Sequence, residues 1–458
     1  MASNIGIMDR SDQLSRLGLF DSRVPRYTSY PTAPQFTPGV SADEMAAWIE
    51  AIPDRSEISV YVHVPFCRRL CWFCACRTQG TRNPATVRAY LETLKSEIGH
   101  LRQFLDPSVR IARLHWGGGT PTLLTPEMIA DLAGAIADAA PLADGAEFSV
   151  EIDPNEIDDA RLDALVAAGM NRASIGIQDF DPEIQAAIGR LQSYDVTRHA
   201  VDALRARGIA SLNADILYGL PHQTRPRIAE SVQRLLSLNP DRVALYGYAH
   251  VPWMARRQAI IPAESLPTPS ERLELFRTAR ELFLWDGYEE IGIDHFARPE
   301  DGMARAAREG RLRRNFQGYT EDTAPVLVGL GASAISRFPQ GYAQNASSTG
   351  DYTKRIRAGM FATARGHVLS RGDRLRGRMI EALMCDFRID SAEMVECHGA
   401  TQAQLSELYR EAVARFADFV TVTPDGLSIR PEGRPLARMI ARCFDAYDLA
   451  STGHSSAV

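Results

Sequence analysis

The amino-acid sequence predicts an α/β protein built on a partial (β/α)6 barrel, with an irregular N-terminal segment and a smaller, mainly helical C-terminal domain. Two observations predict the barrel. Between about residues 58 and 335, short β-rich runs alternate with longer segments of helical periodicity, which is the pattern of βα units around a parallel sheet. Glycines and polar residues follow the ends of successive runs, where the functional loops of such barrels gather.

Six strands are expected in this region. They are predicted at residues 58–64, 111–116, 147–152, 172–177, 212–217 and 242–248. The segments 84–104 and 193–208 carry apolar residues at helical spacing, and Gly208 stands where a helix is expected to end. Six βα repeats are fewer than the eight of a closed barrel, so the sequence predicts a partial one.

The two flanks of the barrel region differ from it. Residues 1–50 are rich in Ser, Pro and Tyr and have no regular pattern, whereas residues 366–449 are mainly helical with a short β-like segment at 420–429. We therefore divide the chain into an N-terminal segment (1–50), the barrel (51–365) and a C-terminal domain (366–449). The small, polar residues at 450–458 predict a disordered tail.

Composition excludes several classes of protein. The chain has 458 residues, of which 45% are hydrophobic and 24% charged, and a net charge of -6. These values are typical of a globular protein and not of a disordered, fibrous or nucleic-acid-coating one. The N-terminus opens no apolar run of signal-peptide length, and no stretch approaches the roughly 18 apolar residues of a membrane span. We expect a cytoplasmic protein with no nucleic-acid or membrane partner.

Four of the seven cysteines lie within ten residues: Cys67, Cys71, Cys74 and Cys76. The first three have the spacing C-x3-C-x2-C, and closely spaced thiolates of this kind hold iron–sulfur clusters. Three ligands would leave one iron of a four-iron cluster open. Zinc is the alternative, although structural zinc takes four ligands, usually from two separated pairs. The remaining cysteines are expected to be reduced and buried; they are Cys385, Cys397 and Cys443.

The sequence also resembles one family at several separate places, in order, from about residue 15 to about residue 448. The cysteine spacing is similar to that of the cluster loop of the radical S-adenosylmethionine (SAM) superfamily. The further matches are PRYTSYPTA at 25–33, YVHVPFC at 61–67, HWGGGTPT at 115–122, ILYGLP at 216–221, DHFARP at 294–299 and NFQGY at 315–319. Together these motifs resemble the oxygen-independent coproporphyrinogen III oxidases.

The resemblance implies a 4Fe-4S cluster on Cys67, Cys71 and Cys74, with the open iron bound to SAM. The glycines at 117–119, Gly118 among them, match those that receive the methionine end of SAM, and Glu151 matches a residue that binds the same molecule. Tyr61 and Ile335 match residues on the other side of the same SAM site. The candidate catalytic residues are Tyr61, Glu151 and Cys76. Cys76 is not expected to be a ligand, because a fourth thiolate would fill the open iron.

A second SAM site is also implied by the resemblance. The matching residues are Phe73, Gly119, Thr120, Gln178, Arg190, Asp215 and Ala249. Asp215 could accept hydrogen bonds from ribose hydroxyls or an ammonium group, Arg190 could pair a carboxylate, and Phe73 could stack on a flat ring. Taken alone, Arg190 would more often be a solvated helix residue.

The implied substrate, coproporphyrinogen III, carries four propionates, so its pocket should contain cationic donors, for which the forked arginine side chain is suited. Arg26 is the leading candidate and Gln317 a weaker one. The other candidates are Arg298, Arg308, Arg311, Arg313 and Arg314, any of which could instead be ordinary surface charge. Because Arg26 lies in a segment with no evident packing role, we expect residues 1–50 to cover the substrate at the barrel mouth, with Tyr27 and Tyr30 shielding it from water.

The reaction implied is the oxidative decarboxylation of two propionates to vinyl groups, giving protoporphyrinogen IX in haem biosynthesis without dioxygen. The cofactor supplies the difficult step, a 5′-deoxyadenosyl radical made from SAM. A low-potential donor such as flavodoxin or ferredoxin would reduce the cluster, and the chain is expected to be a monomer.

The main alternative is a radical SAM haem chaperone, which typically lacks both the 25–31 segment and Cys76. A plain electron-transfer iron–sulfur protein is disfavoured, because it needs neither an open iron nor a SAM pocket.

Overall fold

The computed structural model describes residues 10–448. The strands of the main sheet are β1 (Glu57–Val64), β4 (Arg110–Gly118), β5 (Leu142–Ile152), β6 (Arg172–Gln178), β7 (Ser211–Tyr218), β8 (Arg242–Gly247), β9 (Glu289–Ile291), β10 (His295–Ala297), β13 (Leu327–Leu330), β14 (Ile335–Arg337), β15 (Gly341–Asn345) and β16 (Thr363–Val368). The helices around it are α2 (Ala42–Glu50), α3 (Pro84–Phe104), α4 (Pro126–Ala139), α5 (Asp159–Ala167), α6 (Pro182–Ala187), α7 (Tyr194–Ala206), α8 (Arg225–Ser237), α9 (Pro269–Trp285), α10 (Gly302–Arg308) and α11 (Thr349–Arg357).

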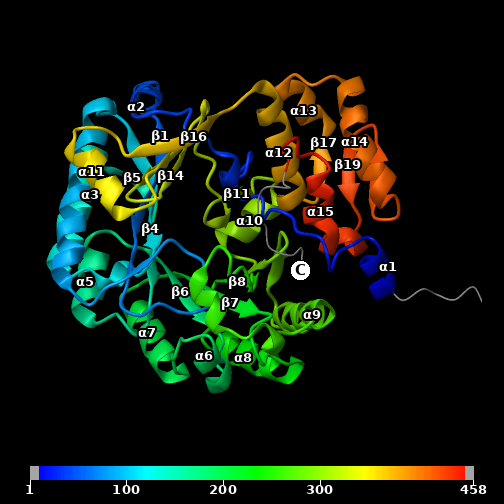
Figure 1. Cartoon of the computed structure of the whole chain (residues 1–458), viewed down its shortest axis with the longest axis horizontal. Helices are drawn as coiled ribbons and strands as arrows, with labels where there is room; N and C mark the ends of the chain where they lie inside the picture. Colours follow the sequence, from blue (N-terminus) through cyan, green and yellow to red (C-terminus); the bar gives the residue numbers. More distant parts are fainter. Residues whose placement is uncertain (1–9, 449–458) are drawn as a thin grey trace, which may run out of the picture.

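The sheet is an open barrel. Its strand order is β16-β15-β14-β13-β1-β4-β5-β6-β7-β8-β10-β9. The run from β13 to β8 is parallel, whereas the strands beyond it at both ends are antiparallel. Figure 1 shows the helices that follow the parallel strands on the outside of the sheet. Because β16 and β9 do not pair with each other within the described residues, the barrel is partial, as predicted.

The six predicted strands are confirmed as β1 and β4 to β8, although β5 begins at Leu142 and not at residue 147. In β1, the apolar residues are nearly or completely buried, with Ile58 and Val62 at 0% exposure. The first long helix, α3, has the predicted bounds, because Asn83 accepts a hydrogen bond from the Ala85 amide and a proline occupies the first turn. Gly208 follows the end of α7 with φ +80°.

A separate group of elements forms the C-terminal part of the chain. It consists of α12 (Arg371–Cys385), β17 (Arg388–Asp390), α13 (Ser391–His398), α14 (Gln402–Phe416), β18 (Val420–Thr423), β19 (Gly426–Ile429) and α15 (Ala437–Arg442). The predicted β-like segment is the hairpin of β18 and β19, to which β17 adds a third strand. These elements enclose a hydrophobic core of their own. The predicted tail at 450–458 lies outside the described residues.

The N-terminal segment is less irregular than predicted, because it contains α1 (Arg10–Arg16) and α2, and α2 begins with a capping box at Ser41. It also joins both cores. Leu14, Leu19 and Val24 belong to the C-terminal core, whereas Met45 belongs to the barrel core. Figure 1 shows α1 beside the C-terminal helices and α2 near β1. The first 50 residues therefore connect the two parts of the molecule.

The expectation that residues 25–31 have no packing role is wrong. Tyr27 and Tyr30 are about as buried as core residues, at 4% and 5% exposure, and both belong to the C-terminal core. The Tyr27 hydroxyl donates to the Asp445 carboxylate at 3.0 Å, and the Tyr30 hydroxyl accepts from the Ala446 amide at 2.9 Å. The two rings are therefore part of the C-terminal core and do not form the expected shield over the substrate.

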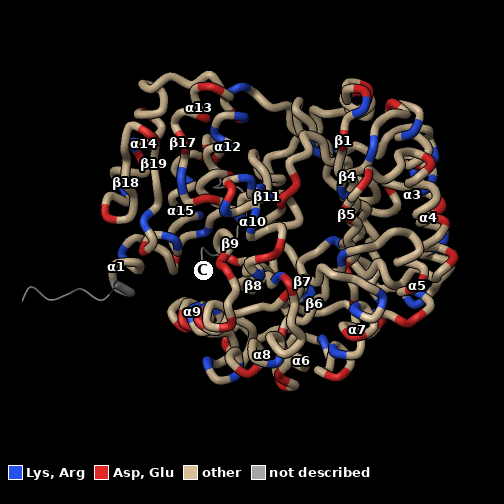
Figure 2. Tube along the Cα trace, turned by 180° about the vertical axis from the view of Figure 1, so that it is seen from behind, with Lys and Arg blue, Asp and Glu red and all other residues tan. Residues whose placement is uncertain are grey.

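Three further expectations can be compared with the structure. All seven cysteines are free; Cys385 and Cys443 are buried as predicted, but Cys397 is exposed, contrary to prediction. No helix within residues 10–448 is long and apolar enough to cross a membrane. Figure 2 shows acidic and basic residues intermixed along the trace.

Candidate active site

The cysteine loop leaves the carboxyl end of β1 and is fixed at several points. Two short parallel strands, β2 (Phe66–Cys67) and β3 (Gln79–Gly80), close it. The Thr81 amide donates to the Cys67 carbonyl at 2.9 Å. Farther along the loop, the Trp72 amide donates to the Ile188 carbonyl at 2.9 Å, which attaches the loop to the end of α6. The loop is therefore held by backbone hydrogen bonds on both sides.

Each of the first three cysteine sulfurs accepts a hydrogen bond from another part of the site. Arg190 Nη1 donates to the Cys71 sulfur at 3.6 Å, and the Cys76 amide donates to the Cys74 sulfur at 3.4 Å. The Thr120 hydroxyl donates to the Cys67 sulfur. Donors of this kind favour thiolates over thiols, and thiolates are the form that binds iron.

Two buried guanidinium nitrogens beside the cysteines indicate room for a further acceptor. Arg190 Nε and Arg257 Nη1 have no hydrogen-bond partner within the described residues. Both arginines act electrostatically on Cys74. A buried donor without an acceptor costs free energy, and a cluster with its sulfurs and bound ligands would supply acceptors here. The donor set therefore fits an iron–sulfur cluster.

The pKa values of the thiols follow from their positions. Burial raises the pKa of Cys67 to about 11. A hydrogen bond from the Cys76 thiol lowers the pKa of Cys74 to about 6, and the same bond raises the pKa of Cys76. The Cys76 carbonyl also accepts from Arg257 Nη2 at 3.2 Å. Cys76 thus lies directly against the triad, as a neighbour of Cys74.

Two glycines after β4 bring the backbone close to this loop. Gly118 has φ +103°, and a Cβ atom there would lie 2.2 Å from the His63 ring. At Gly119 a Cβ atom would lie 2.6 Å from the Phe66 carbonyl. Side chains are therefore excluded at both positions, and a ligand can approach the peptide groups directly.

Glu151, at the end of β5, is bound to the same glycine segment. The Gly118 amide donates to its carboxylate at 3.0 Å, and His115 Nε2 lies 3.4 Å from the other oxygen. Desolvation raises the pKa of Glu151, but the hydrogen bonds from His115 and Gly118 outweigh it and hold the pKa below its ordinary value. Glu151 is therefore an anion at neutral pH.

Tyr61 packs against two histidines beside Glu151 and Gly118. Its ring stacks on His115, with centroids 5.7 Å apart, and its hydroxyl lies 3.0 Å from His63 Nδ1. Desolvation lowers the pKa of His63. Because His63 Nε2 faces the Arg77 carbonyl, which can only accept, Nε2 carries the proton and Nδ1 accepts from Tyr61. Ile335 begins β14, two strands from β1.

A second group of residues surrounds Arg190. Its guanidinium donates to the Gly176 carbonyl at 2.7 Å and lies 3.6 Å from the Asp153 carboxylate. Gln178, which has φ +72°, points its amide toward Gly176 as well. The Arg190 side chain is only 13% exposed, so it is not a solvated helix residue.

Asp215 lies in this group, in register with Gly176. Asn213 donates to the Asp215 carboxylate at 2.8 Å, yet desolvation raises the pKa of Asp215 to about 6. No cation is within hydrogen-bonding distance of Asp215 among the described residues. Gln258 Nε2 donates to both the Phe73 and the Ala249 carbonyl, at 2.6 and 3.1 Å, and so ties the cysteine loop to the segment after β8.

Comparison with known proteins identifies the family. The family model of the radical SAM superfamily matches residues 61–235. An oxygen-independent coproporphyrinogen III oxidase of Paracoccus denitrificans is 66% identical over 98% of this chain and 100% of its own length. The chain belongs to the oxygen-independent coproporphyrinogen III oxidase family. It is therefore a radical SAM enzyme.

Two further relatives agree with this assignment. An oxygen-independent coproporphyrinogen III oxidase of Cereibacter sphaeroides is 62% identical over 95% of this chain and 97% of its own. The solved structure of coproporphyrinogen III oxidase from Escherichia coli, described as a radical SAM enzyme, is 36% identical and superposes with a TM-score of 0.89, covering 93% of this chain and 100% of that one. The similarity thus includes the N-terminal segment and the C-terminal domain.

The arginine candidates from the sequence separate into two groups. Arg26 and Arg314 line a cavity of about 730 Å³ between β8 and the C-terminal domain. The other candidates do not line this cavity: Arg298 pairs with Asp286, Arg308 with Glu289 and Arg311 with Glu309, and Arg313 donates to the Leu312 carbonyl. Gln317 is exposed in the turn between β11 (Arg313–Asn315) and β12 (Gly318–Thr320), away from the cavity lining.

Sequence reasoning missed several residues of the site. His63 and His115 lie in motifs that were recognised, and alternation along β1 places His63 on the same face as Tyr61, which could have indicated its role. Gln258 and Arg257 belong to a short 3₁₀ helix after β8, and no motif marks them. Asp179 directly follows β6, but it is fully buried and accepts a hydrogen bond from the Ser231 hydroxyl.

Proposed function

We propose that the chain converts two propionate groups of coproporphyrinogen III into vinyl groups and so produces protoporphyrinogen IX. For each propionate, R–CH2–CH2–COO⁻ gives R–CH=CH2 and CO2, with the release of one proton and two electrons. The names of the relatives and the near-complete coverage of both chains support this proposal.

The cofactors would be held by the residues described above. Cys67, Cys71 and Cys74 would bind a 4Fe-4S cluster, and when bound with SAM this cluster supplies a carbon-centred radical. The Gly118 backbone and the Glu151 carboxylate would form the binding surface for the methionine end of SAM. Because Glu151 is held as an anion by His115, it would attract the SAM ammonium group. Tyr61 and Ile335 would line the other side.

A second SAM molecule would occupy the group around Arg190. The geometry supports a polar site here. Gln178 ends β6, Asp215 lies within the adjacent strand β7 in register with Gly176, and Arg190, between α6 and α7, donates to the Gly176 carbonyl. Phe73 and Ala249 are linked through Gln258 and would close the same site together with Gly119 and Thr120. We therefore propose two SAM molecules per chain.

The remaining roles follow from position. Cys76 would assist the chemistry as a proton or hydrogen donor beside the cluster without being a ligand. Arg26 would pair a substrate propionate from the barrel rim, where it already donates to the Gly247 carbonyl at 2.7 Å. A low-potential protein such as flavodoxin or ferredoxin would deliver electrons to a monomeric enzyme.

The observation that carries the proposal is that three cysteine sulfurs on one fixed loop each accept a hydrogen bond. The donor to Cys67 is Thr120, two residues after Gly118, whose amide binds Glu151. The test is an anaerobic comparison of haem and coproporphyrinogen III as ligands of the cluster-loaded protein. With SAM and a low-potential reductant, coproporphyrinogen III should be converted to a vinyl product. Tight haem binding without any conversion of coproporphyrinogen III would instead indicate a haem chaperone.

A further inference from the structure

The cavity of about 730 Å³ lies between α9, the segment after β8 and the C-terminal domain. Its volume is within the range of binding sites for molecules larger than an amino acid. Eight arginines and four carboxylates line it; Arg26, Arg272 and Arg314 lie near β8, whereas Arg280, Arg434 and Glu290 lie at the other end. The described lining therefore has more cations than anions.

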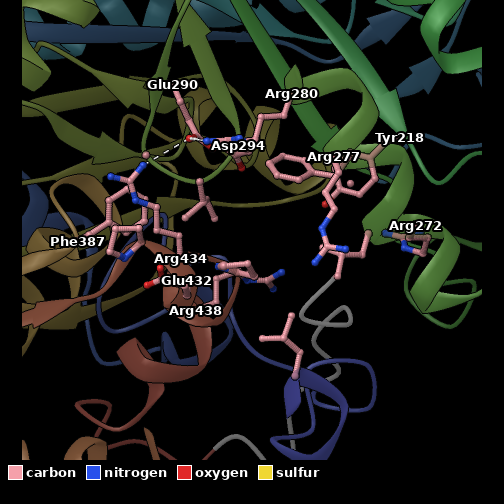
Figure 3. A pocket seen from close by; sticks show the side chains of 18 of the residues that line it. Tyr218, Arg272, Arg277, Arg280, Glu290, Asp294, Phe387, Glu432, Arg434 and Arg438 are labelled. Carbon is pink, nitrogen blue, oxygen red and sulfur yellow. Dashed lines mark hydrogen bonds and ion pairs between the residues drawn. The ribbon is translucent and has the colours of Figure 1, made fainter. Parts of the chain in front are cut away.

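At one end of the cavity, an arginine of α9 and an arginine of the C-terminal domain are paired with the same carboxylate. Figure 3 shows Arg280 and Arg434 directed at Glu290. Arg280 makes two hydrogen bonds to that carboxylate, at 2.9 and 2.8 Å, and Arg434 approaches it at 3.5 Å. Glu290 therefore offsets part of the positive charge at this end of the cavity, which makes this end less suited to another anion than the end near β8.

Nearer β8, the guanidinium groups are bound mostly to neutral atoms. Arg272 donates to the Tyr248 carbonyl at 2.8 Å, and its Nε has no hydrogen-bond partner within the described residues. Arg26 donates to the Gly247 carbonyl at 2.7 Å. Carbonyl groups satisfy donors without cancelling the positive charge, so an anion would bind favourably between these side chains.

Arg314 is the most buried of these cations, at 6% exposure. Its Nη1 has no hydrogen bond within the described residues and lies 3.9 Å from the Asp294 carboxylate. Asp294 is also engaged by His295, whose Nδ1 lies 2.7 Å away. Asp294 acts electrostatically on Arg314, Arg26 and Arg438, and Arg26 in turn acts on Arg272, so cations outnumber carboxylates at this end of the described lining.

The walls between the charged groups are apolar and partly aromatic. They include Leu273, Phe276, Ile293, Phe387 and Phe419. A ligand that fits this lining combines an apolar body with carboxylate groups at its periphery. The cavity also includes Ala249, whose carbonyl shares Gln258 with Phe73 of the cysteine loop. One end of the cavity therefore borders the proposed cofactor site.

We infer that this cavity is the substrate subsite, in which Arg272 and Arg314, together with Arg26, bind propionate carboxylates of the tetrapyrrole while the apolar walls contact its pyrrole rings. The inference rests on the proposed function. It goes further by assigning propionate binding to α9 and β11, and by placing the macrocycle between the barrel and the C-terminal domain.

The test is equilibrium binding of coproporphyrin III, the stable oxidised form with four propionates, followed by fluorescence. The proteins are the wild type, Arg272→Gln and Arg314→Gln, with Arg298→Gln as the matched control outside the cavity. Removing one partner from a buried charge pair should weaken binding by about 30-fold or more. The control should bind like the wild type. Coproporphyrin III tetramethyl ester, which has no carboxylates, should not distinguish the variants.

Other measurements keep the possible outcomes apart. Arg314→Lys retains the positive charge but loses the forked guanidinium group, so it should bind coproporphyrin III more tightly than Arg314→Gln and less tightly than the wild type. Thermal unfolding identifies any variant that fails to fold. If the Arg→Gln variants bind coproporphyrin III like the wild type, the subsite assignment is wrong while the proposed function stands. If they lose SAM and keep coproporphyrin III, the arginines bind the SAM carboxylate instead. If the wild type neither binds nor converts the tetrapyrrole, the proposed function itself fails.

Discussion

Replacing Asp215 by Asn should stabilise the cofactor-free protein and weaken SAM binding at the same time. Burial raises the pKa of Asp215 from 3.8 to about 6. A pKa difference of this size means that the charged Asp215 carboxylate destabilises the folded protein by about 3 kcal/mol at most. Asn keeps the hydrogen bond from Asn213 and removes the buried charge, so the free energy of unfolding at pH 7.5 should rise by about 1–3 kcal/mol.

The sign of the pH dependence follows from linkage. Between pH 4 and 6 the folded protein binds more protons at Asp215 than the unfolded chain does, so wild-type stability falls as the pH rises through this range. The gain in free energy of unfolding from Asp215→Asn should therefore be fully present above pH 6 and disappear toward pH 4. Asp202→Asn is the control, since Asp202 is exposed on α7 and forms an ion pair with Arg198 at 3.6 Å.

The assay combines chemical denaturation of the cofactor-free protein at several pH values with SAM binding to the cluster-loaded protein. We expect the wild type to bind two SAM molecules per chain and Asp215→Asn to bind one at the same concentrations. An Asn variant that is less stable than the wild type at pH 7.5, or whose advantage is the same at pH 4.5 and pH 7.5, would refute the argument from burial. Retention of both SAM molecules would show that Asp215 does not contribute to the second site.

Three other predictions concern single residues. Cys71→Ala should lose iron and the cluster absorption, whereas Cys76→Ala should retain both; the assignment fails if iron analysis gives the reverse. Gly118→Ala should lower the free energy of unfolding by about 1–3 kcal/mol, because a φ of +103° is unfavourable for Ala and the new Cβ would clash with His63. The control is Gly134→Ala in α4, whose Cβ would have no atom within 4 Å and which should leave the free energy of unfolding unchanged or raise it. Burial raises the pKa of Glu97 to about 7, so wild-type stability should fall between pH 5 and 7.5, and a Glu97→Gln variant should lack that part of the slope although it is less stable overall. Equal slopes for the two proteins in parallel unfolding series would contradict this.

The barrel could be predicted from the sequence because its signals are local. Each parallel strand is an apolar run bounded by turn residues, and α3 begins at an Asn-Pro pair that marks a helix start. The glycines and carboxylates of the site follow strand ends, so topology alone gathers them. Cys67, Cys71 and Cys74 were found by their spacing.

Other features depend on contacts between distant segments and could not be predicted. Tyr27 lies in a segment without regular structure, and its partner Asp445 is more than 400 residues away in the sequence. The pairing of Arg190 with a sulfur and that of Gln258 with two carbonyls also depend on loop conformation. The arginine-lined cavity combines α9, β11 and the C-terminal segment, which no sequence pattern links.

The most direct test of the proposed reaction follows the tetrapyrrole by mass during anaerobic turnover of the cluster-loaded protein with SAM and a low-potential reductant. We predict that coproporphyrinogen III loses carbon dioxide twice, passing through a species with a single vinyl group to protoporphyrinogen IX. No conversion should occur without SAM or with Cys71→Ala. A cluster-loaded wild-type protein that leaves the substrate mass unchanged, or that forms vinyl product without SAM, would contradict the proposed function.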